Sequence, residues 1–366
     1  MSQLPLDGLR VLDVTRVLAG PLATMQLGDL GAHVIKVERP GTGDESRGWG
    51  PPFDSRGESA YYLCCNRNKL SVAADCDKAE DAEFIRSLVA TADVAVDNFL
   101  PGSLARRGLD PATLVARHPK LVWCTISGFE SDPGRPGYDY VMQAEAGWMS
   151  ITGEADGEPM RAGTALVDVL TGKDALVAIL AALSGVRSGR AVNRHVSVSL
   201  FSTAAAALVN VAQNVLVSGA DPVRMGTAHP NLVPYQLFHA ADGPFVLAVG
   251  NDVQYAAVAR ELGVPELAAP RFATNAGRVT HRDEVVALVR ARVGQESVAH
   301  WVALCRRHGV PAGAVRRVRD VLRDVAGSPL TGIPPQAPGA VRRPPPRLDE
   351  HGELVRAHGW DAFARA

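Results

Sequence analysis

One aspartate, Asp168, is a candidate for a carboxylate that acts as a nucleophile. Asp168 occurs in the stretch GTALVDVLTG, just before an apolar run over residues 170–183 that predicts a buried helix. A carboxylate with a reference pKa of about 3.9 is ionised near neutral pH and can attack an electrophile without a general base. Aspartate is also a common helix N-cap, and residue type alone favours that role. Both roles stay open on these grounds.

The cysteines give little support for a thiol or metal site. Their number is odd and two of them are adjacent, which argues against a disulfide framework. No Cys-x-x-Cys, His-x-x-x-His or His-Glu-x-x-His pattern is present, so we predict no metal centre. We expect small, buried apolar side chains at the five positions, Cys64, Cys65, Cys76, Cys124 and Cys305.

Charge and length exclude several classes of protein. Lys and Arg total 38 against 39 Asp and Glu, so no surplus of cations exists to neutralise nucleic acid or an anionic membrane. No uncharged apolar run reaches the ~18 residues of a membrane span, and residues 1–7 do not resemble a signal peptide. The 366 residues are enough for about two domains of a protein that we expect to be soluble and cytoplasmic.

Elements that alternate along the first half of the chain must position Asp168. A β-rich run at 9–15, a helical stretch at 22–30 and a second β-rich run at 33–38 form a β-α-β unit. This order predicts a Rossmann-like, doubly wound α/β domain. The alternation continues with strands at 70–74, 93–97, 121–127 and 196–200, and with helices at 79–90 and 113–118.

The first turn of this unit excludes a dinucleotide cofactor. Glu38 ends the second strand, where an acid that binds ribose would sit. However, the turn at 15–21 contains one glycine and no Gly-x-Gly-x-x-Gly, so bulky side chains occupy the place of a pyrophosphate.

Composition divides the rest of the chain. We predict a large Rossmann-like domain at 1–200, a linker at 201–225 with a helix over 204–217, and a small α/β domain at 226–325. The small domain includes a strand at 245–249 and a helix at 283–293. Prolines then accumulate, which predicts an extended tail at 326–366 that returns to the large domain.

Several stretches, in order along nearly the whole chain, resemble the class III CoA-transferases, the family of formyl-CoA transferase and the carnitine CoA-transferase. The N-terminal stretch LPLDGLRVLDVTRVLAGPLATMQLGDLGAHVIKVERPGTGDESRGWG is the most extensive match. The others are NRNKLSV, VDNFLPGSLARRGL, PGYDYVMQAEAGWMSITG, RAGTALVDVLTG and HPNLVPYQLF.

The resemblance implies a role for Asp168. Its place in the motif matches the family's catalytic aspartate, which attacks an acyl-CoA thioester to give a mixed anhydride. Returning CoA thiolate then forms an aspartyl-CoA thioester, and a carboxylic acid takes the CoA by the reverse steps. CoA would be a substrate, and no cofactor would be bound permanently.

Motif positions also imply the binding residues. Leu18 replaces a glutamine of formyl-CoA transferase, which suggests a less polar substrate pocket than one for oxalate or formate. A lid that excludes water from the anhydride would correspond to residues 249–254. CoA contacts are implied for Val17, Ala19, Arg39, Asp75, Asn98, Phe99, Arg106 and Tyr138, and pocket positions for Leu18, Trp49, Tyr61, Gly250, Asn251 and Gln254.

The resemblance further implies a ring-shaped chain in an interlocked homodimer, which no composition or spacing could suggest. The same fold carries α-methylacyl-CoA racemases, which need bases on both faces of the substrate carbon. Their His-Asp pair would fall at Tyr138 and Asp139, so the histidine is missing here. A CoA-binding protein without catalysis is the remaining alternative.

Overall fold

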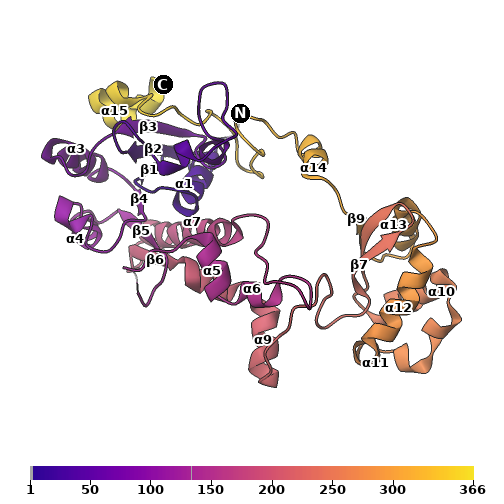
Figure 1. The fold of residues 1–366 in the computed structure, drawn as a ribbon. Coiled ribbons are helices and arrows are strands. Elements are labelled where there is room, and N and C mark those ends of the chain that lie inside the picture. Colours follow the sequence, from indigo (N-terminus) through magenta and orange to yellow (C-terminus); the bar gives the residue numbers. More distant parts are fainter. Residues whose placement is uncertain (1–2, 133) are drawn as a thin grey trace. The chain divides into compact units, whose positions relative to one another are not determined.

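The structure, a computed structural model, describes residues 3–132 and 134–366 and divides into two compact units (Figure 1). The large unit contains three segments of the chain, Met1–Trp148, Arg161–Ala220 and Leu322–Ala366. The small unit contains Met149–Met160 and Asp221–Val321. The chain therefore leaves and re-enters the large unit twice.

A six-stranded parallel sheet forms the centre of the large unit. Its strand order is β3-β2-β1-β4-β5-β6, the doubly wound order in which the chain reverses direction between β1 and β4. This confirms the predicted mixed α/β fold with a parallel sheet. The strands are β1 (Arg10–Asp13), β2 (His33–Glu38), β3 (Lys69–Ala73), β4 (Val94–Asp97), β5 (Val122–Ser127) and β6 (His195–Ser199).

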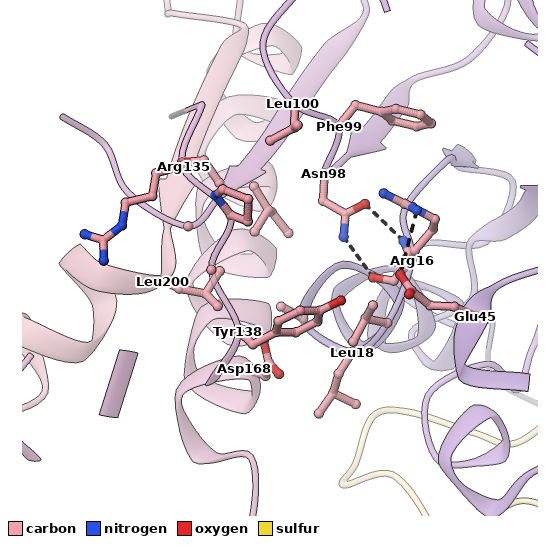
Figure 2. Close-up of a pocket in the computed structure, with 17 residues that line it drawn as sticks. Arg16, Leu18, Glu45, Asn98, Phe99, Leu100, Arg135, Tyr138, Asp168 and Leu200 are labelled. Carbon is pink, nitrogen blue, oxygen red and sulfur yellow. Dashed lines mark hydrogen bonds and ion pairs between the residues drawn. The ribbon is translucent and has the colours of Figure 1, made fainter. Parts of the chain in front are cut away.

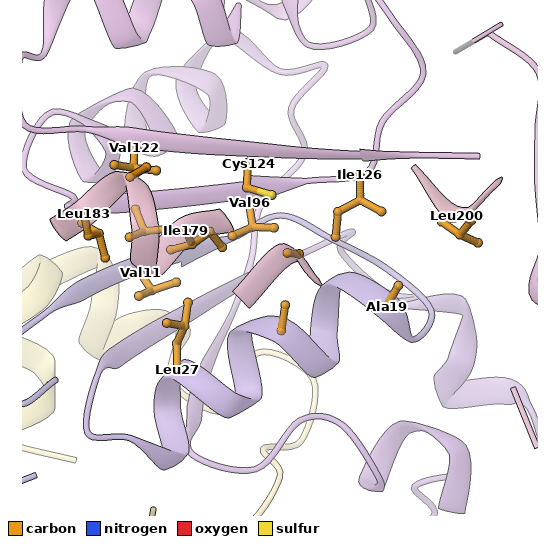
Figure 3. Packing of buried hydrophobic residues seen from close by; sticks show 14 of the residues in the cluster. Val11, Ala19, Leu27, Val96, Val122, Cys124, Ile126, Ile179, Leu183 and Leu200 are labelled. Atoms are coloured by element: carbon orange, nitrogen blue, oxygen red, sulfur yellow. The ribbon is translucent and has the colours of Figure 1, made fainter. Parts of the chain in front are cut away.

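Helices cover both faces of this sheet because successive strand side chains point to opposite sides. Val11 packs into one hydrophobic cluster and its neighbour Leu12 into the other. In the first cluster, Leu27 and Ile179 face the strand residues (Figure 3). Helices α1 (Ala19–Asp29), α5 (Asp139–Glu145), α7 (Leu166–Arg187) and α8 (Leu200–Ala206) cover the first face, and α3 (Ala79–Val89), α4 (Pro111–Arg117), α15 (Gly352–His358) and the 3-10 turn Gly359–Ala364 cover the second.

Helix α7 is the predicted buried helix, and it packs closely on α1. A Cβ on Gly172 would lie 2.8 Å from the carbonyl oxygen of Ala19, so only glycine permits this approach. In the part of the chain that the structure describes, no single helix is long and apolar enough to cross a membrane. One bent pair of helices, α8 with α9 (Val209–Ser218), reaches the length and apolar composition of a membrane span only when the two helices are taken together.

This bent pair differs from the single helix predicted over residues 204–217. The helices α8 and α9 meet at a bend of 69°. Leu200 and Ala204 of α8 are buried in the core, whereas α9 buries none of its residues. Val209 also has φ 38°, outside the right-handed helical region, so the helix cannot continue through it.

The C-terminal segment packs along the large unit. Asn68 accepts hydrogen bonds from the backbone N–H groups of Arg342 and Arg343, at 2.6 and 2.9 Å, and Arg67 donates to the carbonyls of Thr331 and Ile333. The proline-rich part is extended, as predicted. The prediction is wrong for its end, because no proline follows residue 346 and residues 352–364 form α15 and a 3-10 turn.

The small unit has an antiparallel sheet of β7 (Tyr235–Ala240), β8 (Gly243–Ala248) and β9 (Ala312–Ala314). The predicted strand at 245–249 and helix at 283–293 correspond to β8 and α12. Helices α10 (Asp252–Leu262), α11 (Asn275–Thr280), α12 (Arg282–Val293) and α13 (Val298–Arg307) accompany the sheet. The short elements of the chain are α2 (Ala60–Leu63), α6 (Trp148–Ile151), α14 (Val318–Asp324) and 3-10 turns at Glu45–Gly48, Ala105–Arg107, Pro265–Ala268 and Pro270–Phe272.

Two fully buried lysines lie beneath the carboxyl edge of the large sheet. Lys69 Nζ donates to Asp13 Oδ2 at 2.9 Å, to the Pro21 carbonyl and to Asn66. Lys36 Nζ lies 3.0 Å from Asp44 Oδ2 and donates to the Thr15 carbonyl at 2.9 Å. We call these two pairs, Asp13–Lys69 and Asp44–Lys36, the buried ion network.

We predict that Asp13→Asn lowers the free energy of unfolding of the large unit by about 3–5 kcal/mol, because it removes one negative charge from two buried cations. Urea denaturation followed by tryptophan fluorescence measures this, since four of the five tryptophans lie in the large unit. Glu83→Gln breaks the exposed pair with Arg86 and should cost less than about 1 kcal/mol. Equal, small losses for both variants would contradict a structural role for the network.

Candidate active site

The turn between β1 and α1 is held in an unusual conformation. Val17 has φ 72°, in the left-handed region that a β-branched residue rarely adopts. Its N–H donates to Asp44 Oδ1 at 3.2 Å, and Asn98 bonds to both the N–H and the carbonyl of Arg16 (Figure 2). Lys36 Nζ donates a hydrogen bond to the carbonyl of Thr15, the residue before Arg16. The buried ion network and Asn98 therefore determine the shape of this turn.

Asp168 is the third residue of α7, and its side chain is buried with 7% exposed. The alternative role of helix cap is wrong, because Ala165 is the N-cap residue of α7. The N–H groups of Val167 and Asp168 instead donate to Asp139 Oδ2, at 2.8 and 3.3 Å. Asp139 therefore satisfies the start of α7 and leaves the carboxylate of Asp168 available for chemistry.

The electrostatics of Asp168 differ from the sequence expectation of an ordinary, ionised carboxylate. Burial and the nearby charge of Asp139 raise the pKa of Asp168 from 3.8 to about 7. Asp139 is itself fixed by Gln143, which donates to Oδ1 at 2.6 Å. Sequence analysis missed this positioning role of Asp139 and Gln143, although their spacing of four on one helix was a signal for it.

A cavity of about 440 Å³, which we call the Asp168 pocket, opens beside this carboxylate. Leu18, Trp49 and Tyr61, three of the positions implied for the substrate pocket, line it. The rings of Trp49 and Tyr61 meet edge to face with centroids 5.0 Å apart. Burial and the charge of Asp168 raise the pKa of Tyr61, so its hydroxyl stays protonated at neutral pH. One wall of the pocket is therefore aromatic and uncharged.

Two further cavities follow the carboxyl edge of the sheet. The middle cavity, about 240 Å³, shares Val17, Leu18, Tyr138 and Asp168 with the Asp168 pocket. The arginine cavity, about 510 Å³, shares Arg16, Glu45, Phe99 and Leu100 with the middle cavity. Together the three form one groove within the large unit.

The structure brings all eight residues implied for CoA binding to this groove. Val17, Ala19, Asn98 and Tyr138 line the middle cavity, Arg39, Asp75 and Arg106 line the arginine cavity, and Phe99 lines both. The guanidinium groups of Arg16 and Arg107 lie 5.6 and 6.0 Å from the ring centroid of Phe99. The amide of Asn98 bonds to the backbone of Arg16 in the turn, and its contact with CoA stays a prediction.

The remaining predicted pocket residues, Gly250, Asn251 and Gln254, lie in the small unit. Asn251 caps α10, and Gln254 accepts from the Gly250 N–H at 2.8 Å and donates to the Gly309 carbonyl at 2.8 Å. Their side chains therefore fix a turn between β8 and α10. A lid role for this turn stays a prediction.

The cysteines are free, and no group of three or more potential metal ligands occurs among residues 3–132 and 134–366. Cys65, Cys124 and Cys305 are buried, as predicted. The prediction is wrong for Cys64, which is exposed because it follows α2 at the wall of the Asp168 pocket, and Cys76 is half-buried.

A family model described as "CoA-transferase family III" matches residues 6–352. The chain belongs to this family. It is 40% identical to the "Succinate--glutarate CoA-transferase" of Agrobacterium fabrum, over 96% of this chain and 95% of that protein. It is 42% identical to the mouse (Mus musculus) "Succinyl-CoA:glutarate CoA-transferase", over 88% and 74%. A solved CAIB/BAIF family protein from Brucella suis is 41% identical, with a TM-score of 0.82 over 97% and 99% of the two chains.

These comparisons confirm the predicted class III CoA-transferase. Substrates of such enzymes are acyl-CoA thioesters and carboxylic acids.

We predict that Asp168→Asn stabilises the transferase more at pH 8 than at pH 5. The carboxyl titrates near pH 7 when folded and near 3.8 when unfolded, so its contribution to stability falls as the pH rises from 3.8 to about 7. Asparagine does not ionise, so the variant does not lose stability in this way as the pH rises. We expect the gain in free energy of unfolding to be about 1–3 kcal/mol larger at pH 8.

Urea denaturation at the two pH values measures the gain. Asp174→Asn, at an exposed position of the same helix, is the control for the loss of one carboxylate. Equal gains for Asp168→Asn at both pH values would contradict the raised pKa.

Proposed function

We propose that this enzyme passes CoA from an acyl-CoA thioester to a carboxylic acid through covalent intermediates on Asp168. The observation that best supports this proposal is the position of Asp168, a buried carboxylate that lines both the Asp168 pocket and the middle cavity. Among the described residues, none donates a hydrogen bond to its side chain, whereas Asp139 beside it accepts three. Of the two aspartates, Asp168 is the one free to act as nucleophile.

The proposed reaction has four steps. An Asp168 oxygen attacks the thioester carbonyl, the C–S bond breaks, and CoA leaves as the thiolate, giving an acyl-aspartyl anhydride. The thiolate attacks the aspartyl carbonyl and releases the first acid, giving an aspartyl-CoA thioester. The second acid attacks this thioester to form a new anhydride and thiolate. The thiolate then attacks the new acyl carbonyl, which yields the product thioester and restores the Asp168 carboxylate.

The environment of Asp168 suits these steps. A buried carboxylate with a pKa of about 7 is less stabilised as an anion than an exposed one, and is therefore more reactive once ionised. The uncharged wall of Trp49 and Tyr61 offers apolar surface to an acyl chain and excludes water from an anhydride.

For CoA itself we propose the other two cavities. Arg39 and Arg106 line the arginine cavity, and neither forms an ion pair with a described carboxylate, so both are available for phosphate groups. Phe99 lines the same cavity, with the guanidinium groups of Arg16 and Arg107 near its ring, and the middle cavity, which Phe99 also lines, contains Asp168. CoA is a substrate in this scheme, and the chemistry needs no resident cofactor.

We also propose the interlocked homodimer that the family resemblance implies, with residues 201–225 as the linker of the ring. Helix α9 in this segment exposes Leu216 and Val217, 78% and 79% of whose surfaces are accessible. Apolar side chains so exposed are typical of surfaces that a partner covers. A cytoplasmic location remains a prediction.

We predict that Asp168→Asn abolishes CoA transfer by at least about a thousandfold while CoA binding persists, because an amide does not attack a thioester at a useful rate. Initial rates with panels of acyl-CoA donors and acids measure this. Asp174→Asn on the same helix is the control and should stay within about twofold of wild type. Borohydride treatment of the acyl-CoA-loaded wild type should reduce the thioester at Asp168 alone.

Retention of a tenth or more of the transfer by Asp168→Asn would contradict the assignment. Incorporation of deuterium at the α-carbon of a chiral 2-methylacyl-CoA in heavy water, without exchange of CoA, would instead identify a racemase. Tight CoA binding without transfer to any acid would indicate a binding protein.

We predict a dimer of about twice 38.7 kDa by light scattering, persisting on dilution because interlocked chains cannot separate without unfolding. Leu216→Glu in α9, the helix that we propose the partner covers, should lower the urea midpoint of the dimer without releasing a folded monomer. Glu154→Gln, at an exposed position of the small unit, serves as control. A stable monomer for the wild type across the dilution series would contradict the proposal.

A further inference from the structure

Three arginines line the cavities next to Asp168, and they differ in their partners. Arg16 lies 3.7 Å from a carboxylate oxygen of Glu45. Arg135 forms an ion pair with Glu145. Arg161 forms no ion pair with any carboxylate among the described residues, and its exposed side chain lines the Asp168 pocket. Its positive charge is therefore available to a ligand.

Arg161 is oriented by neutral groups. Its Nη1 donates to the Ala162 carbonyl at 3.1 Å, and its guanidinium lies 5.6 Å from the ring centroid of Tyr140. The next peptide is anchored because the Ala162 N–H donates to Gln143 Oε1 at 2.8 Å. The same Gln143 also holds Asp139, so one helix positions Arg161 and the nucleophile together.

Arg161 and Asp168 line the same pocket without forming an ion pair with each other. Arg161 is the one positively charged side chain that lines the Asp168 pocket in the described chain. Asp168 lines the same pocket, yet no cation lowers its pKa, which burial and Asp139 raise. Leu18, Trp49 and Tyr61 line the pocket as apolar and aromatic surface. The pocket therefore offers a reactive carboxylate, a largely apolar wall and a separate unpaired guanidinium.

We propose that Arg161 binds the second carboxylate of a dicarboxylic acid whose first carboxylate reacts at Asp168. The proposal rests on the proposed CoA transfer and names the substrate class and the residue that selects it. A planar guanidinium offers paired N–H donors that match a carboxylate, and Leu18 and Trp49 give the same pocket apolar surface for a methylene chain. A monocarboxylic acid of equal length leaves Arg161 without a partner.

The Arg161 guanidinium could instead bind a phosphate of CoA, and an experiment can distinguish the two roles. We predict that Arg161→Gln lowers the preference for butanedioate over butanoate, and for pentanedioate over pentanoate, by about 10- to 100-fold in kcat/KM, the loss expected for a charge-assisted hydrogen bond. The loss should appear in the KM of the diacid. Arg161→Lys should recover part of it.

Arg190→Gln is the matched control, because Arg190 is exposed and lines none of the three cavities. Arg161→Gln and Arg190→Gln should have equal melting temperatures. Equal losses for diacids and monoacids would overturn the proposal, and a rise in KM for every acyl-CoA would assign Arg161 to CoA instead. A wild type that transfers CoA to no acid would overturn the proposed function, whereas transfer with an unchanged acid preference in Arg161→Gln overturns this inference alone.

Discussion

The contacts of Lys36 and Lys69 with Asp44 and Asp13 are the constraint on which the site depends. Two ammonium groups are fully buried beneath the sheet edge, at a desolvation cost that their partners must offset. In return, Lys36 fixes the Thr15 carbonyl and Asp44 the Val17 N–H. The two ion pairs therefore matter more for the shape of the turn than for the stability of the fold. Without them, Val17 loses the hydrogen bond to its N–H, and Asn98 alone must hold the turn that lines all three cavities.

The two aspartates next to the groove divide their roles by environment. Asp139 accepts hydrogen bonds from the start of α7 and from Gln143, while Asp168 is left with burial and a like charge as neighbours. In such a pair, different surroundings give two chemically identical carboxyl groups different properties and different roles. One carboxylate becomes part of the scaffold, and the other retains its reactivity because its surroundings stabilise its charge poorly.

Much of the groove could be predicted because parallel strands end at one edge. The family resemblance implied Arg39, Asn98 and Phe99. Because Arg39 follows β2 and Asn98 and Phe99 follow β4, the alternation of strands explains why they meet at one edge. The raised pKa of Asp168 could not be predicted, because it depends on a carboxylate 29 residues earlier that tertiary packing brings near. The function of Asn68 was equally hidden, since the two N–H groups that donate to its side-chain oxygen lie more than 270 residues away. Exposure of Cys64 depends on a pocket wall that no local pattern encodes.

The C-terminal segment has a consequence for how the protein is made. Strand β3 is the edge of the large sheet, and the backbone N–H of Ala73 is paired with Asp349 at 2.7 Å. Ser71 likewise lies against His351. An uncovered edge strand is a template for pairing with other chains. During synthesis this edge is complete long before residues 349–351 leave the ribosome, so the nascent chain exposes an unpaired strand edge until these residues fold onto it.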